Sequence, residues 1–274
     1  MKLDWQSTQT PDERAAQLAT ALPDGYVGEA VPCEMPSGRA AALQRLSEYD
    51  PNRYSRTRNF TDGHVSRLSP YLRHGMLTMV EVRDFIIERF TGHNDGVDGF
   101  LRQLAWRDFF LKVLDWYGTA VEDDLEPPKH TVEREEKLPS DIAQGRTGLP
   151  CMDGILANLF QEGYLHNHAR LWFAAYLCHF RGLSWKVGAQ LFRRHLLDGD
   201  IASNSLNWQW VASTFSIKPY FMNRENINLF SHGQWCDTCA VQCPFDATYE
   251  ELRSRLFDVR VAPLAIRNRA EESE

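Results

Sequence analysis

The sequence lacks the apolar segments that a membrane or secreted protein needs. Its start, MKLDWQSTQTPDERAAQ, has no apolar core of the kind found in signal peptides. No run approaches the ~18 apolar residues of a membrane span. We therefore expect a cytoplasmic protein without a membrane partner. An excess of positive charge is also lacking, because the formal net charge is -7. This excludes a long-range field that attracts nucleic acid, so a nucleic-acid site would need a local basic groove.

Strand-like alternation of apolar and polar residues is scarce, and the chain has no internal repeat. Helical periodicity instead dominates from Ser37 onward. It is clearest after Pro150, where apolar residues recur at helical spacing: Met152, Ile155, Leu156, Leu159 and Phe160. An earlier stretch also has an apolar face: Val80, Phe85, Ile86 and Phe90. The sequence therefore predicts an all-α fold.

Composition divides the chain into three parts. Residues 1–36 are rich in proline, glycine and small polar residues, and we expect an N-terminal arm with at most one short helix that lies on the main domain. Residues 37–260 are predicted to form a single helical domain. Within it, residues 119–150 are expected to be a long exposed connection. Residues 261–274 end in Glu-Glu-Ser-Glu and are expected to be a loose tail.

Three of the six cysteines are clustered near the end of the chain, in the pattern C-x2-C-x3-C followed by proline: Cys236, Cys239 and Cys243. Thiols stay reduced in the cytosol, so clustered cysteines favour a metal site over a disulfide. The spacing fits a [4Fe-4S] cluster. Zinc is the alternative, and unrelated thiols or a disulfide are the plainest explanation. A fourth ligand is missing from the run, and the other cysteines are candidates for it: Cys33, Cys151 and Cys178.

Residues 151–230 are dense in polar and aromatic groups that a buried polar ligand would need. Taken singly, each group has an ordinary explanation as a surface pair, a turn or a core aromatic. Together they could hold a flat heteroaromatic molecule by hydrogen bonds and stacking. The groups are Asn167, Arg170, Asp198, Asp200, Asn204, Asn207, Trp208, Gln209 and Trp210.

Several short segments, in their order and spacing, resemble the FAD-binding catalytic domain of the photolyase/cryptochrome family. The resemblance extends over about residues 37–222 and implies the helical fold of that domain. It is carried by the following segments: Tyr54–Arg58, Val65–Leu72, Phe100–Phe109, Gly163–Arg170, Asp198–Asn204, Trp208–Trp210 and Pro219–Phe221.

The resemblance implies a U-shaped FAD. Tyr54 and the segment Ser66–Ser69 would hold the diphosphate, although Val65 stands where a threonine is common. An Arg170–Asp198 pair would lie beside the isoalloxazine ring, and Asn204 would face its N5 atom. The full set of cofactor-binding residues that the resemblance implies is Tyr54, Ser66, Arg67, Leu68, Ser69, Gln103, Arg107, Asn167, Arg170, Asp198, Gly199, Asp200 and Asn204.

The resemblance also implies a site for damaged DNA. Trp106 and Trp210 match the aromatic walls on which a flipped-out pyrimidine dimer stacks. Gln103 occupies the place usually held by a glutamate, and an amide is a poor proton donor. Because Asn167 replaces one member of a paired-histidine arrangement, cyclobutane dimers are favoured over (6-4) products. The DNA-facing positions implied are Arg58, Trp106, Asn167, His168 and Trp210.

Photoreduction in this family follows a chain of tryptophans. Trp208 and Trp185 match its first two steps, whereas the third falls near Val132. The alternatives for that step are Trp116, Tyr117, Trp172 and Trp235. The catalytic set that the resemblance implies is therefore Gln103, Trp106, Trp185, Asn204, Trp208 and Trp210.

The end of the chain is similar to that of iron–sulfur bacterial cryptochromes and photolyases, through Cys236, Cys239 and the segment Cys243–Tyr249. In that branch a further cysteine opens the helix before the Asn-x-x-Arg segment, which implies Cys151 as the fourth cluster ligand. The gap before the last cysteine is shorter here. Family members also carry an N-terminal α/β antenna domain, which the short arm cannot provide. We therefore expect no antenna chromophore.

Two functions follow as predictions. The first is a lyase: a monomer that splits cyclobutane pyrimidine dimers by electron transfer from excited reduced FAD, with a preference for single-stranded DNA. The alternative is a flavin and iron–sulfur photoreceptor for blue light, or a redox protein, of the cryptochrome type without repair activity. A flavin-binding relic without light chemistry is the third.

Overall fold

The computed structural model describes residues 9–23, 34–90, 92, 94–130 and 134–257. Regular structure in these ranges is helical, apart from one isolated bridge between Glu135 and Leu183. The prediction of an all-α fold is therefore confirmed. The α-helices are α1 (Pro11–Ala21), α2 (Arg39–Glu48), α3 (Tyr54–Thr57), α4 (Ser69–Arg73), α5 (Met79–Arg89), α6 (Asp95–Tyr117), α7 (Ser140–Ala143), α8 (Pro150–Glu162), α9 (Asn167–Ala175), α10 (Trp185–His195), α11 (Ile201–Ala212), α12 (Arg224–Phe230) and α13 (Tyr249–Leu256). Two 3-10 helices, η1 (Pro51–Arg53) and η2 (Gly118–Glu122), and a π-helix, η3 (Tyr176–Phe180), complete the set.

Local signals explain where the long helices begin and end. The longest, α6, begins after Asn94, whose side chain accepts hydrogen bonds from the N–H groups of Gly96 and Val97 at 3.0 and 2.9 Å. It ends at Gly118, and α8 ends at Gly163, which has a φ of 62° in the left-handed region. The predicted apolar face of α8 is confirmed, because the four residues from Met152 to Leu159 that belong to it are at most 1% exposed.

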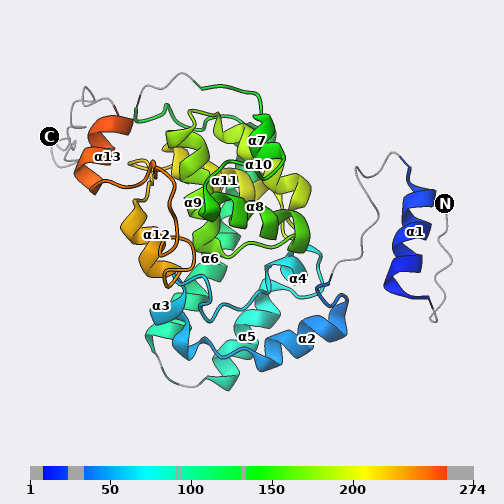
Figure 1. Ribbon diagram of the computed structural model, residues 1–274. Coiled ribbons are helices and arrows are strands. Elements are labelled where there is room, and N and C mark those ends of the chain that lie inside the picture. Colours follow the sequence, from blue (N-terminus) through cyan, green and yellow to red (C-terminus); the bar gives the residue numbers. More distant parts are fainter. Residues whose placement is uncertain (1–8, 24–33, 91, 93, 131–133, 258–274) are drawn as a thin grey trace, which may run out of the picture.

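The described helices enclose two large hydrophobic cores. One is built by α8 to α11 and has Trp172, Phe173 and Trp185 at its centre. The other is built by α2, α4, α5 and the start of α6, and contains Leu46 and Ile86. Helix α6 links the two, because it contacts α3 and α5 as well as α11. Figure 1 shows α2, α4 and α5 together at one end of the body, with α7, α8, α10 and α11 toward the other.

Two details of the sequence-based prediction are wrong. Residues 119–150 are not a wholly exposed connection, because η2 and α7 fold against the helical body and bury Val121 and Ile142 completely. On α5, Val80 is 54% exposed, whereas Val82 is fully buried in its place. The apolar residues of α5 fit two overlapping helical faces, one with Val80 and one with Val82, and the sequence pattern alone did not distinguish them.

The arm and the tail are described only in part. Helix α1 is the single short helix expected within residues 9–23, but none of its residues is buried, and Figure 1 draws it apart from the helical body. The predicted packing of the arm on the domain is therefore not observed for these residues. The predicted loose tail, residues 261–274, lies outside the described residues. Among the helices of the described ranges, none has the length and apolar character that a membrane span requires.

Candidate functional site

Two connected cavities lie between the two cores. The outer chamber has a volume of about 770 Å³ and is lined by α3, residues 65–69, α6, the start of α9, α11 and residues 215–217. The inner chamber, of about 240 Å³, reaches α10 and the loop that follows it. The two share several lining residues, which indicates that one opens into the other: Tyr54, Ser69, Gln103, Arg107, Tyr164, Asn167, Leu171, Ser203 and Asn207.

The inner chamber contains the ion pair that the sequence predicted. Both terminal nitrogens of Arg170, on α9, donate to the two carboxylate oxygens of Asp198, at 3.0 and 2.8 Å. The Nε group of Arg170 donates to the carbonyl of Leu165 at 2.9 Å, so the whole guanidinium is engaged. Burial alone would raise the pKa of Asp198, but the charge and hydrogen bonds of Arg170, together with Ser69 and Arg107, outweigh it, so the pKa lies below its usual value. The chamber therefore presents a fixed, charged and hydrogen-bonding surface to a ligand.

Asp200 has a different place from the one predicted. It lines neither chamber. Its carboxylate accepts from the N–H of Ser203 at 2.7 Å, which caps the start of α11, and it pairs with Arg107 of α6 at 3.1 Å. Asp200 thus positions Arg107, which does line both chambers, rather than contacting a ligand itself.

Asn204 and Trp208, on α11, face the inner chamber. The Nδ2 group of Asn204 donates to the carbonyl of Ala189 at 2.8 Å, which leaves its side-chain oxygen available to a ligand. Trp208 is 2% exposed and packs edge-on against Phe192 at 5.0 Å between ring centroids. Trp185 is buried on α10, and its indole N–H donates to Asp124 at 2.6 Å.

Close contact between α10 and α11 depends on Gly188. A Cβ atom at this position would overlap the six-membered ring of Trp208. Gly188 stands three residues after Trp185 on the same face of α10. Trp208 therefore packs against the face of α10 that also contains Trp185.

The Gly188→Ala substitution should therefore destabilise the protein. We expect a loss of about 1–3 kcal/mol in the free energy of unfolding, the usual cost of overpacking a core. Denaturant unfolding followed by circular dichroism measures it. Gln190→Ala, at an exposed position of the same helix, should change stability by about 0.5 kcal/mol or less. Equal effects of the two substitutions would contradict the packing argument.

Aromatic side chains surround the outer chamber. Trp106 on α6 and Trp210 on α11 both line it and are 49% and 41% exposed. Gln103, Arg58 and Asn167 also line it. The sequence-based set is therefore largely brought together here, and the chamber combines stacking surfaces, amides and three arginines: Arg58, Arg67 and Arg107.

His168 is the exception, because it does not face this chamber. It is 8% exposed and packs against Trp172 and Phe230, with ring centroids 4.9 Å away in both cases. The predicted DNA-facing role of His168 is therefore wrong. The neighbouring Asn167 points to the chamber instead, since consecutive residues of a helix face different directions.

The segment Ser66–Ser69 lines the outer chamber in full. Within it Arg67 has a φ of 54°, in the left-handed region that non-glycine residues rarely adopt. Its guanidinium lies 4.9 Å from the ring centroid of Tyr164. Tyr164 also lies beneath Arg170, at 5.5 Å, and was not predicted as a site residue. In the sequence, Tyr164 was marked as a site residue only by its place in the segment Gly163–Arg170, which also contains Asn167 and Arg170.

Other aromatic and apolar residues at the chamber mouth were also missed. Phe109 and Phe215 stack at 6.4 Å between centroids, and Ile217 is 86% exposed. These residues come from separate parts of the chain, and no local pattern predicts that they meet. They extend the apolar surface around Trp106.

The four cysteines assigned to a cluster come close together. Cys151, in the first turn of α8, has a pKa of about 12, raised by burial and then by the nearby Cys236 and Cys243. Cys239 in turn acts on Cys236 and Cys243. Residues 9–23, 34–90, 92, 94–130 and 134–257 contain no group of three or more His, Cys, Asp or Glu side chains arranged to hold a metal ion. Of the other candidates, Cys178 is a core residue of the π-helix, and Cys33 lies outside the described residues.

An all-helical domain with a two-chambered cavity, an ion pair inside and aromatic walls outside is a ligand-binding domain by its architecture. Residues 100–241 match the family model described as the FAD binding domain of DNA photolyase. The chain is 37% identical over 169 residues to a deoxyribodipyrimidine photo-lyase of Streptomyces griseus, and 34% identical over 214 residues to one of Thermus thermophilus. Among solved structures, a cryptochrome of Synechocystis sp. PCC6803 is similar, with a TM-score of 0.65 and 27% sequence identity.

The chain belongs to the photolyase/cryptochrome family and carries its helical FAD-binding domain. The match to the Streptomyces griseus photo-lyase covers 57% of this chain, the match to the Thermus thermophilus photo-lyase 73%, and the match to the cryptochrome 72%. The same matches cover only 35%, 50% and 44% of the length of those three proteins, so the chain spans half of each relative or less.

Proposed function

We propose that this protein is a light-dependent DNA-repair enzyme that splits cyclobutane pyrimidine dimers. The observation that carries the proposal is the outer chamber, where half-exposed Trp106 and Trp210 stand at the entrance to a cavity that contains the Arg170–Asp198 pair. A dimer flipped out of a DNA strand offers two adjacent bases, which half-exposed aromatic rings can hold by stacking. The relatives named deoxyribodipyrimidine photo-lyase support the same chemistry.

The inner chamber fits FAD by the chemistry of its side chains. Arg170 and Asp198 supply charged hydrogen-bonding groups, and Asn204 has a free side-chain oxygen next to them. Hydroxyl groups of Tyr54, Ser66 and Ser69 line the outer part, where the diphosphate would lie. When bound, FAD supplies the light-excited electron donor.

The protein's own residues would orient the substrate and keep water away from it. Trp106 and Trp210 hold the dimer, and Arg58 neutralises a neighbouring phosphate. The amide of Gln103 can hydrogen-bond a thymine edge, but it has no acidic proton to transfer. Trp208 and Trp185 would be the two steps of the electron-transfer chain next to the flavin during photoreduction. The third step, which connects them to the protein surface, is not assigned to a residue.

The substrate form would be an opened or single-stranded DNA. The net charge of -7 opposes binding to a long stretch of duplex. Single-stranded DNA can be held at a short site mainly by stacking, which the aromatic walls of the outer chamber supply.

We further propose that Cys151, Cys236, Cys239 and Cys243 ligate a [4Fe-4S] cluster. Their thiols influence one another in the pairs described above, which fits four ligands around one centre. The C-x2-C-x3-C run followed by proline is typical of iron–sulfur ligand segments, which favours the cluster over zinc. The first ligand is on α8 and the others precede α13, so the cluster would tie the end of the domain to its core.

The cluster proposal predicts the metal content of two cysteine variants. Protein purified without oxygen should contain iron and acid-labile sulfide, and Cys236→Ser should lose most of both, because a hydroxyl is a poor ligand for iron in such clusters. Cys178→Ala removes a thiol from the core and should keep its iron. Elemental analysis measures the outcome, and zinc in place of iron, or equal iron in both variants, would contradict the proposal.

The alternative is a photoreceptor or redox protein without repair activity. Gln103 favours it, since this amide replaces an acid near the lesion site, and a similar solved structure is named a cryptochrome. The deciding experiment is an assay of repair on protein loaded with FAD and photoreduced under anaerobic conditions. Oligonucleotides with one thymine dimer, single- or double-stranded, are exposed to blue light or kept dark. We expect repair in light only, faster on the single strand; photoreduction without repair of either form would favour the alternative.

A further inference from the structure

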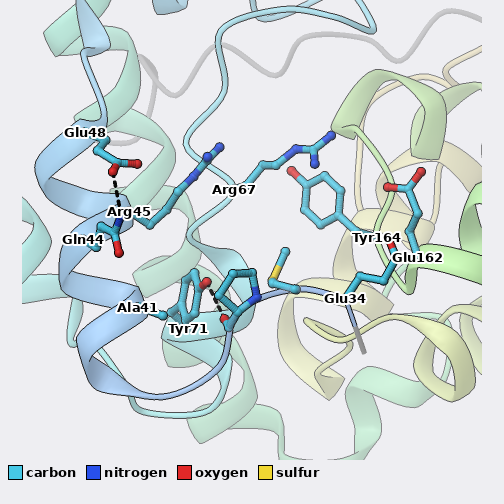
Figure 2. Close-up of a pocket in the computed structure, with 11 residues that line it drawn as sticks. Glu34, Ala41, Gln44, Arg45, Glu48, Arg67, Tyr71, Glu162 and Tyr164 are labelled. Atoms are coloured by element: carbon cyan, nitrogen blue, oxygen red, sulfur yellow. Dashed lines mark hydrogen bonds between the residues drawn. The ribbon is translucent and has the colours of Figure 1, made fainter. Parts of the chain in front are cut away.

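Two further cavities meet at a pair of arginines on the surface of the domain. Their volumes are about 350 and 370 Å³, and both are lined by Arg45, Glu48 and Arg67. Figure 2 shows the first, between α2, Tyr71 of α4 and the end of α8. The second is bounded by residues 61–65 and His166; it shares Val65 and Arg67 with the outer chamber and no lining residue with the inner one. Cavities of this size are typical of sites for small molecules, which occupy about 300–1,000 Å³. We refer to the region as the arginine site.

The two arginines are held in place by neighbouring residues. The Nε group of Arg45 donates to the carbonyl of Ser66 at 2.9 Å, and Arg67 lies over the ring of Tyr164. In the part of the chain that the structure describes, neither forms an ion pair with a carboxylate. Figure 2 shows Arg67 extending toward Tyr164, with Arg45 beside it at the same edge of the cavity. Two adjacent guanidinium groups repel each other, and a shared anion would relieve this repulsion.

The backbone of Arg67 supports the same view. Its φ of 54° is unfavourable for any residue with a side chain, whereas glycine adopts it freely. Such strain is typical of residues held at ligand sites by the surrounding structure. Here it presents a guanidinium to both cavities.

Three residues that line the second cavity have a buried polar atom without a hydrogen-bond partner among the described residues. They are Tyr49, which is 5% exposed and has an unpaired hydroxyl within those ranges, and His64 and His166, each with an unpaired Nε2 atom there. The Nδ1 atom of His166 accepts from the N–H of His168 at 3.1 Å, so the proton of the neutral ring is on Nε2. Burial lowers the pKa of His166 to about 4, so the ring is neutral at pH 7.

The chemistry of these groups identifies the class of ligand. Two guanidinium groups, the His166 Nε2–H and the Tyr49 hydroxyl are donors, as an oxyanion requires. Glu48 and Asp62 line the same cavity and would accept from hydroxyl or amino groups on the ligand. We propose that Arg45, Arg67 and His166 bind the phosphate group of a small phosphorylated molecule, about the size of a mononucleotide, at a site beside the outer flavin chamber, with which it shares Val65 and Arg67.

Calorimetric titration of the FAD-loaded protein with AMP and with inorganic phosphate tests this. It is done in the dark and without DNA, so the outcome does not depend on the proposed repair activity. We expect saturable binding of one AMP per chain, with phosphate as a competitor. Arg45→Gln and Arg67→Gly should each weaken it tenfold or more, and glycine at position 67 also avoids backbone strain. Arg83→Gln, which removes an exposed arginine that lines neither cavity, should change the affinity less than twofold.

Several results would overturn the proposal. One is the absence of saturable binding of AMP and phosphate up to millimolar concentrations. Another is unchanged affinity in both arginine variants, since the ligand would then bind elsewhere. Release of FAD as AMP binds would show that the ligand enters the cofactor chamber. Binding of a single-stranded oligonucleotide that depends on Arg45 and Arg67, without binding of AMP, would assign the arginines to a nucleic-acid strand instead.

Discussion

The Trp106→Ala variant is expected to lose most light-dependent repair. Trp106 is half-exposed at the outer chamber, and its ring neighbours within the described ranges are Phe109 and Phe110, at 5.5 and 5.9 Å. Its removal therefore costs little core packing, and the loss should concern the lesion. Stacking of a base on an aromatic ring contributes about 1–3 kcal/mol, which corresponds to roughly 5- to 150-fold in affinity.

The measurement compares lesion binding in the dark with repair in blue light. Anisotropy of a labelled oligonucleotide with one thymine dimer gives the affinity, and loss of the dimer gives the repair rate. Trp116→Ala is the matched control, since Trp116 is on the same helix, is 75% exposed and lines neither chamber. Both variants are reduced chemically before the assay, because Trp116 is also a candidate step of the photoreduction chain. If both variants repaired at the same rate, Trp106 would not be a wall of the lesion site.

The second large effect concerns the Arg170–Asp198 pair. Arg170→Ala leaves the carboxylate of Asp198, which is 3% exposed, without its partner. Removing one member of a buried pair typically costs about 3–5 kcal/mol, because a desolvated charge remains. We expect a loss of this size in the free energy of unfolding, together with loss of bound FAD.

A surface pair provides the control for this prediction. Arg193 pairs with Glu122, and both side chains are more than one third exposed. Arg193→Ala should therefore cost about 1 kcal/mol or less. Urea unfolding and the flavin content of the purified proteins measure both variants. Retention of FAD and full stability in Arg170→Ala would show that the pair supports neither the cofactor nor the fold.

The same pair predicts a dependence on pH. In the folded protein the pKa of Asp198 is lower than its usual value, because the favourable effect of Arg170 outweighs that of burial. Its contribution to stability is therefore complete above about pH 4, near the ordinary pKa of an aspartate. It is lost as the pH falls through the lower pKa of the folded state. Asp198→Asn should remove this part of the acid sensitivity in urea unfolding between pH 3 and 7.

Site residues could be predicted where a local segment determines their direction. Asn167 and Arg170 stand three apart at the start of α9, and both line the inner chamber. His168, between them, was predicted to face DNA but turns into the core against Trp172. Asp200 was predicted to line the cofactor site but caps α11 and holds Arg107. In both cases the residue type was compatible with either role.

By itself the sequence determined the all-α class, the family and many of the polar and aromatic residues of the two chambers, because helical periodicity and short motifs are local properties. Only the tertiary structure decided which faces are buried, as with Val82 in place of Val80. It also decided that Cys151 approaches Cys236 from a distant helix. The arginine site likewise exists only after folding, since Arg45, Arg67 and His166 belong to separate segments. Contacts between such segments depend on how helices pack, and packing is a property of the whole chain.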